Sequence, residues 1–188
     1  MSVIPALCEE IVDCLTAIGS PIGDFLQPGL TDQQILRVQS RLPFQFPTAI
    51  MDMYKWHNGT KSEKGTTFFP WWGFLPLSDA YDRYRMLSTP NDGHWPSHWF
   101  PIFSASDISS IGVSCIDTQA EDCEIVCYEY TAGAQTEFSS LEGMLRTILE
   151  AYKAGVIFMG GDGELDQNDD GFAEIARRMN PEVKRWAL

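Results

Sequence analysis

Residues 42–77 read LPFQFPTAIMDMYKWHNGTKSEKGTTFFPWWGFLPL. Pro43 and Pro47 exclude a helix that runs through them, because proline lacks an N–H and biases the preceding residue toward extended geometry. After Pro47, a favoured first-turn residue, the spacing of apolar residues predicts a short helix, and Gly59 in the Asn-Gly pair predicts its end. The aromatic run 68–74 predicts a strand packed on a core. We therefore expect this stretch to fold as a helix laid back over the first strand of a sheet.

The flanking sequence predicts helices on both sides of further strands. Apolar residues recur at three- and four-residue steps in segments 2–18 and 141–152, and Thr31 with Gln34 has the pattern of a capping box. Ser139 with Glu142 predicts a second capping box, and Ser78 a further helix N-cap. Strands are expected near 111–117, 124–129 and 136–138, and the two prolines of 95–103 restrict that stretch to an edge strand or an extended segment. A last helix is expected over 172–179.

These elements predict an α+β fold. The expected architecture is one domain spanning residues 1–188, with a central, mainly antiparallel sheet flanked by N-terminal and C-terminal helices. A chain of 188 residues with 44% hydrophobic residues is long enough to bury a core without disulfide or metal staples. Its apolar runs are shorter than the roughly 20 residues that a membrane helix needs, and no export signal is apparent, so we expect a soluble cytoplasmic protein.

Five cysteines are an odd number for a disulfide framework. In a chain without export signals, they are expected to be buried thiols. Cys123 and Cys127 would share one face of a strand, with Cα atoms about 13 Å apart, which is too far for one zinc ion or a disulfide.

The net charge of −13 is concentrated in one part of the chain. Residues 117–174 carry 14 acidic side chains, against Arg146 and Lys153. So acidic a protein repels nucleic acid and is suited to a basic protein partner, whose approach it would accelerate. The alternative is that the acidity serves solubility alone.

The order of several segments resembles the SUKH superfamily. An "LP" pair, a short helix ending in "NG" and an aromatic segment closing on residues 75–77 come first; the matching segments that follow are HWPSHWFPIF at 94–103, GVSCID at 112–117 and FSSLE at 138–142. The similarity runs from about residue 31 to residue 152, and the acidic loop and helix of 160–188 follow it. In place of the usual glycine-rich lead into the 112–117 strand, this chain has SDISS at 106–110. The resemblance implies a binding protein and not an enzyme, because members are cell-wall assembly regulators and immunity proteins for polymorphic toxins.

The acidic loop near the C-terminus has part of a calcium-loop pattern. Asp166, Asn168 and Asp170 with Gly171 match its first half, but Arg177 occupies the twelfth position, where a bidentate glutamate is needed. The pattern therefore favours a solvated loop that caps the last helix, and we expect neither a metal nor another cofactor.

The tryptophans are the strongest indication of a functional surface. Two adjacent strand residues such as Trp71 and Trp72 point to opposite faces, so both cannot enter one core. An aromatic groove rimmed with acids is typical of protein-binding sites. The candidate partner-binding residues are Trp56, Trp71, Trp72, Trp95, Trp99, Asp117, Glu121 and Asp122.

Three functions remain in view. The leading hypothesis is a non-catalytic immunity protein that binds a cognate basic toxin, of which a nuclease is one type, with no nucleic-acid or membrane partner of its own. The alternatives are a scaffold or regulator of the cell-wall assembly type, and a small-molecule-binding protein or enzyme that uses the aromatic groove. A deep pocket with converging polar groups would favour the last of these, and a flat acidic face a protein partner.

Overall fold

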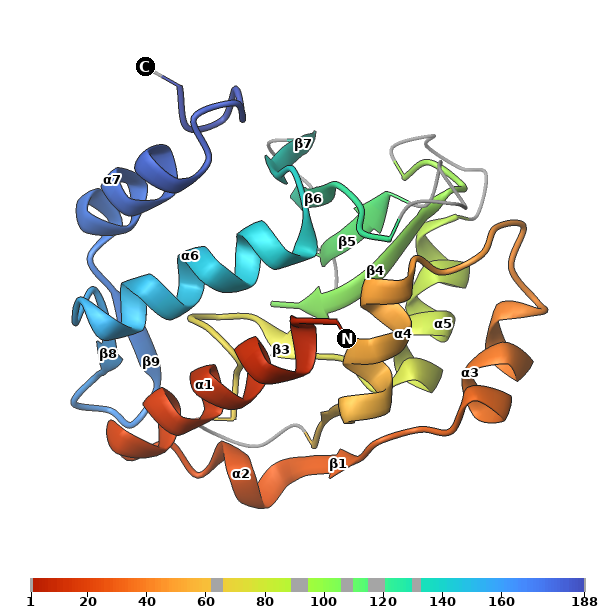
Figure 1. The fold of residues 1–188 in the computed structure, drawn as a ribbon, viewed down its shortest axis with the longest axis horizontal. Helices are drawn as coiled ribbons and strands as arrows, with labels where there is room; N and C mark the ends of the chain where they lie inside the picture. The colour runs from red at the N-terminus through yellow and green to blue at the C-terminus, as the bar shows by residue number, and fades with distance from the viewer. Residues whose placement is uncertain are drawn as a thin grey trace.

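The computed structural model describes residues 2–61, 66–88, 95–105, 110–114, 121–129 and 133–187. They form an α+β fold in which helices pack around antiparallel sheets, as the sequence predicts (Figure 1). The helices are α1 Ile4–Ala17, α2 Ile22–Phe25, α3 Asp32–Gln39, α4 Thr48–Trp56, α5 Leu77–Leu87, α6 Leu141–Lys153 and α7 Asp169–Met179.

The main sheet has five strands in the order β3-β4-β5-β6-β7, and every neighbouring pair is antiparallel. Its strands are β3 Gly73–Phe74, β4 Trp99–Ser104, β5 Ser110–Ser114, β6 Ile125–Glu129 and β7 Gly133–Phe138. Two small antiparallel pairs accompany it, β1 Leu26–Pro28 with β2 His57–Thr60 and β8 Ile157–Met159 with β9 Leu165–Gln167.

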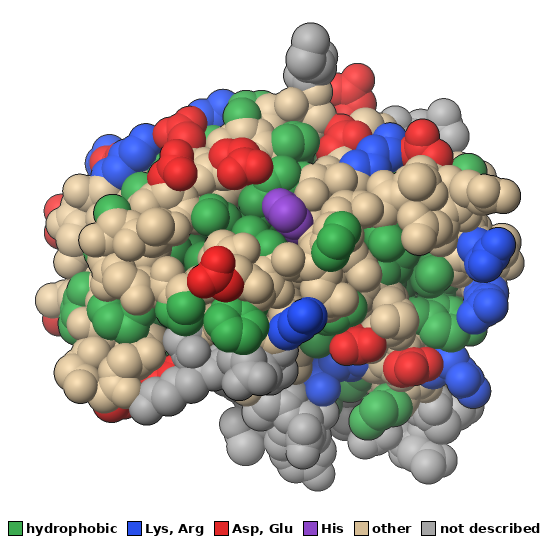
Figure 2. Space-filling view, turned by 90° about the horizontal axis from the view of Figure 1, so that it is seen from below, with side chains coloured by type: hydrophobic (Ala, Val, Ile, Leu, Met, Phe, Trp, Pro, Cys, Tyr) green, Lys and Arg blue, Asp and Glu red, His purple; other side chains and the backbone are tan. Residues whose placement is uncertain are grey.

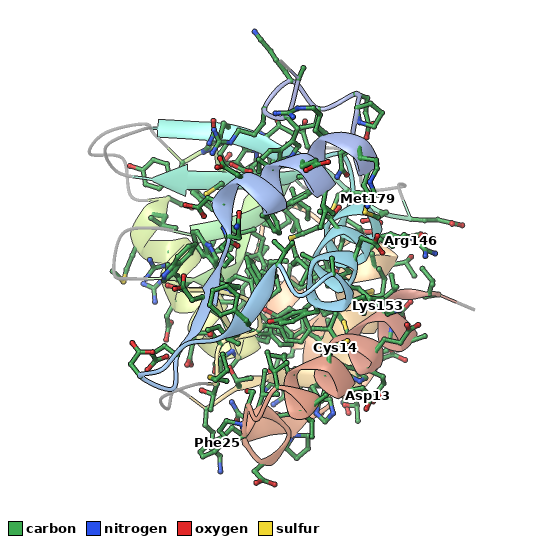
Figure 3. All side chains as sticks on the ribbon, turned by 90° about the vertical axis from the view of Figure 1, so that its left-hand side faces the viewer. Asp13, Cys14, Phe25, Arg146, Lys153 and Met179 are labelled. Carbon is green, nitrogen blue, oxygen red and sulfur yellow. The ribbon has the colours of Figure 1, made fainter. Side chains whose placement is uncertain are left out.

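The core lies between the sheet and the pair of helices α1 and α6, which run side by side (Figure 1). Lys153 of α6 reaches Glu10 of α1 at 2.8 Å on the outer side of this pair (Figure 3). Burial of a large apolar side chain stabilises the fold by about 1.5–3 kcal/mol, so the apolar stripe of α6 holds this helix in place. The predicted stripe is buried throughout: Leu141, Met144, Leu145, Ile148, Leu149 and Tyr152.

The opposite face of the sheet is also covered. Val126 and Tyr128 of β6 are buried, although they point away from their buried neighbours Ile125 and Cys127. The ring of Trp95 lies over this face, 6.0 Å from the ring of Tyr128. Both sides of the sheet are therefore partly covered.

Gly112 makes room for the Trp95 ring. A Cβ atom at this position would come within 2.7 Å of the Phe100 carbonyl oxygen and 2.9 Å of the indole of Trp95. The indole N–H of Trp95 donates to the Trp99 carbonyl at 2.9 Å, which fixes the ring in place.

The Thr31–Gln34 capping box is present, but other predicted helix ends are wrong. The N-cap of α6 is Ser140, whose hydroxyl accepts the Gly143 N–H, while the Ser139 hydroxyl donates to Glu182. Pro76 precedes α5 directly, so Ser78 lies inside that helix. Ser140 is next to Ser139, and Pro76 is two residues before Ser78. The sequence pattern alone does not decide which residue of each pair precedes the helix.

The end of α4 also differs from the prediction. The helix stops at Trp56 because His57 turns to extended geometry with φ −148° and enters β2. Gly59 lies inside β2 with φ 74°, where a Cβ would come within 2.3 Å of the Pro76 nitrogen. Glycine at position 59 allows the backbone of Leu75 and Pro76 to approach closely, and it is not a helix C-cap.

Strand β4 is not at the edge of the sheet. It pairs with β3 through Phe103 and Ser104 and with β5 along most of its length. Pro101 lies where the register of the β4–β5 pair shifts, between Pro101 and Phe103, and proline is tolerated at such an irregularity. Within the described residues, no helix is long and apolar enough to cross a membrane.

Candidate functional site

The aromatic run before β3 forms a tight turn. The Trp72 N–H donates to the Phe69 carbonyl and the Phe68 N–H to the Trp72 carbonyl, each at 2.9 Å. Pro70 occupies the second turn position and Trp71 the third, with a φ of 70°. A proline followed by a residue of positive φ is the pattern of a type II turn, whose third position normally holds glycine or asparagine. The predicted continuous strand 68–74 is therefore wrong, and Pro70 is the reason.

Trp71 combines a positive φ with a side chain that is exposed to solvent. Of the described residues other than glycine, it alone has a positive φ, and 53% of its surface is exposed. A non-glycine residue in this region costs of order 1–3 kcal/mol and persists where the surroundings enforce it. Trp72 is half-buried against the core, with its ring 6.3 Å from that of Phe69. The turn, and not the alternation of side chains along a strand, gives Trp71 and Trp72 their different exposure to solvent.

A groove of about 700 Å³ opens beside Trp71. Its floor is formed by side chains of β5, β6 and β7, and the opposite wall by α7 and the segment that follows it. In Figure 1, α7 and this C-terminal segment stand across from the end of β7. The aromatic side chains that line the groove are Phe69, Trp71, Trp72, Phe138, Phe172 and Trp186.

Hydrogen bonds and an ion pair fix the C-terminal wall of the groove. The Trp186 indole donates to the Glu137 carbonyl at 2.7 Å, and Arg177 Nε donates to the Trp186 carbonyl at 3.0 Å. Arg185 lies 3.3 Å from the Glu137 carboxylate and over the Trp186 ring. The two arginines of the groove are thus bound to groups of the protein itself, and these contacts fix the wall in place.

A second hollow, of about 390 Å³, lies on the other side of Trp71. The hairpin of β8 and β9 supplies its acidic side, visible at the side of the molecule that faces the viewer in Figure 3. Asp162, Glu164 and Asp166 line it together with Trp71. Trp71 therefore stands between an aromatic groove and an acidic hollow.

The other candidate tryptophans lie elsewhere. The Trp56 indole donates to Glu9 at 2.7 Å and joins the end of α4 to α1. Trp95 is buried against the covered face of the sheet, and its ring meets that of Trp99 edge-on at 5.5 Å. The structure thus brings Trp71 and Trp72 together in the groove and places the other three outside its lining.

The candidate acids 121 and 122 form part of a separate hollow. Asp122 accepts hydrogen bonds from the Leu141 and Glu142 N–H groups at 2.9 and 3.0 Å and so caps the start of α6. Glu121 is exposed and lines a hollow of about 530 Å³ with Asp122. Asp117 lies outside the described residues.

The residues of the calcium pattern belong to two regular elements. Asp166 lies in β9 and Asp170 in the first turn of α7, while the Asn168 side chain caps α7 by accepting the Gly171 N–H at 2.8 Å. Across the described part of the chain, no three histidine, cysteine, aspartate or glutamate side chains gather as metal ligands.

Charge is unevenly distributed over the surface. On the face below α2 and β1, acidic and basic side chains are interspersed (Figure 2). Around Trp71, Asp169 and Asp170 at the start of α7 and the three acids of the hairpin line the hollows together with four basic residues, Lys61, Arg83, Arg177 and Arg185. The acids of residues 117–174 are thus gathered in part beside the exposed ring.

Comparison with known families identifies the chain. The model of the SMI1 / KNR4 family (SUKH-1) matches residues 29–147. The chain belongs to this family. No curated protein matches it. Among the groove elements, the turn of Trp71 and strands β5 to β7 lie inside the matched range, whereas the β8–β9 hairpin and α7 follow it.

Sequence reasoning misses the residues that complete the site. It does not single out Trp186 or Phe172, because neither lies near the aromatic stretch in sequence. Asp162 and Glu164 stand out only as members of an acidic loop. The sequence feature that could have indicated the groove is Trp186, which follows a run of charged residues. A large aromatic side chain is unusual in a segment that is exposed to solvent.

Proposed function

We propose that this SUKH-1 protein is a non-catalytic protein-binding domain that acts in the cytoplasm as an immunity protein. It binds a cognate basic toxin, of which a nuclease is one type, and blocks it by covering its surface. Trp71 carries the proposal, because an exposed aromatic ring on a strained backbone has no evident use in folding.

A tryptophan flanked by hollows is well suited to a protein partner. Tryptophan is enriched among the few residues that supply most of the binding energy in interfaces, and such residues lie in pockets surrounded by weaker contacts. Trp71 borders the groove, the acidic hollow and a third hollow beside β3. A partner that covers Trp71 would therefore bury aromatic surface at the centre of a larger contact.

The charge supports a basic partner. The net charge of −13 steers a positively charged protein toward the surface and speeds its association. Family membership supports a binding role over a catalytic one, and it also fits the second candidate of this class, a regulator or scaffold like the cell-wall assembly proteins.

A small-molecule-binding protein or enzyme remains the candidate from another class. The volume of the groove, about 700 Å³, is within the range of ligand pockets. The polar groups Arg177 and Arg185 are however engaged by the protein itself, which favours a role in shaping the wall.

Co-expression tests the proposal. The candidate partner is the polypeptide encoded by the neighbouring reading frame, produced in a host whose growth it arrests. The wild-type chain and the Met86→Ala control, which removes an exposed side chain on α5, should restore growth, and Trp71→Gly should not. Restoration of growth by all three would contradict the proposed site, and failure of the wild type to restore growth would contradict the proposed function.

A further inference from the structure

The turn that carries Trp71 needs support from outside itself. Residues 69–72 have the pattern of a type II turn, whose third residue must adopt a positive φ, and Trp71 does so with a φ of 70°. The same four residues can also close a type I turn, in which the third residue has a φ of about −90° and no such strain. A strained residue persists where its surroundings determine the backbone. Contacts with the rest of the protein must therefore decide between the two turns.

The two arms of the turn are held in different ways. The arm that follows the turn is β3, in which Gly73 pairs with Ser104 and Phe74 with Phe103 of β4. The arm that precedes it, residues 66–69, belongs to none of the strands β1 to β9. Phe68 on this first arm is fully buried, with its ring 6.0 Å from that of Phe103. The sheet thus fixes the second arm, and the first arm depends on contacts of its own side chains and backbone.

A hydrogen bond from α6 holds the first arm. The Tyr152 hydroxyl, close to the end of α6, donates to the Phe68 carbonyl at 3.1 Å. Both residues are buried, so this carbonyl relies on a partner within the protein. Burial raises the pKa of the Tyr152 hydroxyl, which therefore stays protonated and able to donate. The buried apolar stripe of α6 in turn keeps Tyr152 in place.

This hydrogen bond is adjacent to those that close the turn. The Phe68 carbonyl belongs to the peptide bond that leads into Phe69, and the Phe69 carbonyl accepts the Trp72 N–H at 2.9 Å. The Phe68 N–H donates to the Trp72 carbonyl, also at 2.9 Å. Without the Tyr152 hydroxyl, a rotation of the Phe68 peptide toward another donor would disturb both hydrogen bonds of the turn. Trp71 would then be free to relax to a negative φ.

We propose that Tyr152 is a positioning residue of the binding surface, whose hydroxyl holds the turn of residues 69–72 in the strained form that presents the Trp71 ring to a protein partner. The presentation to a partner rests on the proposed function, whereas the hold on the turn is a property of the chain alone. Tyr152 is buried and lies outside the lining of the three hollows beside Trp71, so it acts through Trp71 and not by contact with the partner.

Two conservative variants test the hold on the turn. Tyr152→Phe removes the hydroxyl and keeps the ring. Tyr84→Phe is the matched control, because Tyr84 is also buried and its hydroxyl donates to a backbone carbonyl, that of Ser97, at 2.9 Å. Each variant loses a buried hydrogen bond, so we expect both to have a lower melting temperature. Only Tyr152→Phe should shift the backbone amide and indole N–H signals of Trp71 in the NMR spectrum of the full chain.

The strain at Trp71 supplies a second measurement. Trp71→Gly relieves the strain that Trp71→Ala keeps, so the glycine variant should unfold at a higher urea concentration than the alanine variant. This difference should shrink in the Tyr152→Phe background, where the turn has already relaxed, and persist in the Tyr84→Phe background. An equal difference in both backgrounds would overturn the inference. Trp71 signals that stay in place in Tyr152→Phe, or that shift equally in Tyr84→Phe, would overturn it as well.

Binding to the partner of the co-expression experiment separates this inference from the proposed function. We expect Tyr152→Phe to bind about fivefold more weakly, because the apparent dissociation constant rises as the binding-competent fraction of the chain falls, and Tyr84→Phe to bind as the wild type does. If Trp71→Gly binds weakly but Tyr152→Phe binds as tightly as the wild type, the positioning role is wrong and the binding function stands. If Trp71→Gly binds as tightly as the wild type, the binding site itself is wrong, and the NMR signals of Trp71 still decide whether Tyr152 holds the turn.

Discussion

Trp71 is the residue on which the proposed function depends most. Its φ of 70° is one that glycine adopts at no steric cost, and its ring is more than half exposed. A residue selected for stability at this turn position would be glycine. The tryptophan therefore has a cost to stability, and the proposed binding role offers a reason for its side chain at this position.

Substitution of Trp71 should therefore separate stability from binding. Because Trp71→Ala keeps the strained backbone and Trp71→Gly relieves it, we expect the glycine variant to be about 1 kcal/mol more stable than the alanine variant. Urea unfolding measures the difference. An alanine variant at least as stable as the glycine variant would show that the backbone at this position is not strained.

Gly112 is a second residue at which geometry decides the sequence. Gly112→Ala would place a Cβ 2.7 Å from the Phe100 carbonyl oxygen and 2.9 Å from the Trp95 ring, and we expect a loss of about 1–3 kcal/mol in the free energy of unfolding. Gly23→Ala is the control, since a Cβ at that position would meet open space, with no neighbouring atom within 4 Å. Near-ultraviolet circular dichroism should report the displaced indole of Trp95, and an unchanged spectrum and stability would contradict this packing.

At the scale of elements, the start of α6 depends on Ser140 and Asp122. The Ser140 hydroxyl accepts the Gly143 N–H at 2.9 Å, and removal of a capping hydroxyl costs about 1 kcal/mol. We expect Ser140→Ala to destabilise the protein by this amount and Ser139→Ala by less at neutral pH. Thermal unfolding of both variants checks the assignment, and the opposite order would restore Ser139 as the cap.

The neighbouring Ser139 has a different, pH-dependent role. Its hydroxyl donates to Glu182 at 2.6 Å, and this hydrogen bond lowers the pKa of the Glu182 carboxyl. A carboxyl whose pKa is lowered by folding stabilises the folded state above its ordinary pKa, and this contribution is lost as the pH falls through the lowered value. Ser139→Ala should therefore reduce stability slightly at pH 7, and by less at an acid pH at which the Glu182 carboxyl is protonated. The same small loss at both pH values would show that the carboxylate is not involved.

The elements that sequence predicts best are those with a local cause. The Thr31–Gln34 capping box and the apolar stripe of α6 each depend on residues three or four positions apart in sequence, so the sequence predicts both. The turn at Pro70 is not predicted, because the run 68–74 is otherwise aromatic and apolar and so has the composition of a strand. The single proline nevertheless determines the local geometry. The groove could not be predicted, because Trp71 and Trp186 come to line the same groove only through tertiary packing.

Over the whole molecule, the tryptophans differ in what they contact. Trp95 covers one face of the sheet and Trp56 joins α4 to α1, while Trp71 remains available beside the acids of the β8–β9 hairpin. Part of the acidity of the chain lies beside the exposed ring, in the three acids of the hairpin. Composition predicts a basic partner but cannot place the surface that it meets.

Electrostatic attraction of the whole surface predicts a salt-dependent complex. The Debye length falls from about 10 Å at 0.1 M salt to about 3 Å at 1 M, so the association rate with a basic partner should fall across this range. Stopped-flow mixing measures the rate at each concentration. An association rate independent of salt would contradict steering by the net charge.

The central claim, that Trp71 is the centre of a protein-binding surface, is tested most directly by the dissociation constant of the complex with the partner. Calorimetry with the wild type, Trp71→Gly and the control Met86→Ala compares the two exposed side chains on equal terms. The account predicts that Trp71→Gly weakens binding by about 2 kcal/mol or more, as expected of a central interface tryptophan, while Met86→Ala leaves it unchanged. Equal affinities for the wild type and Trp71→Gly would contradict it.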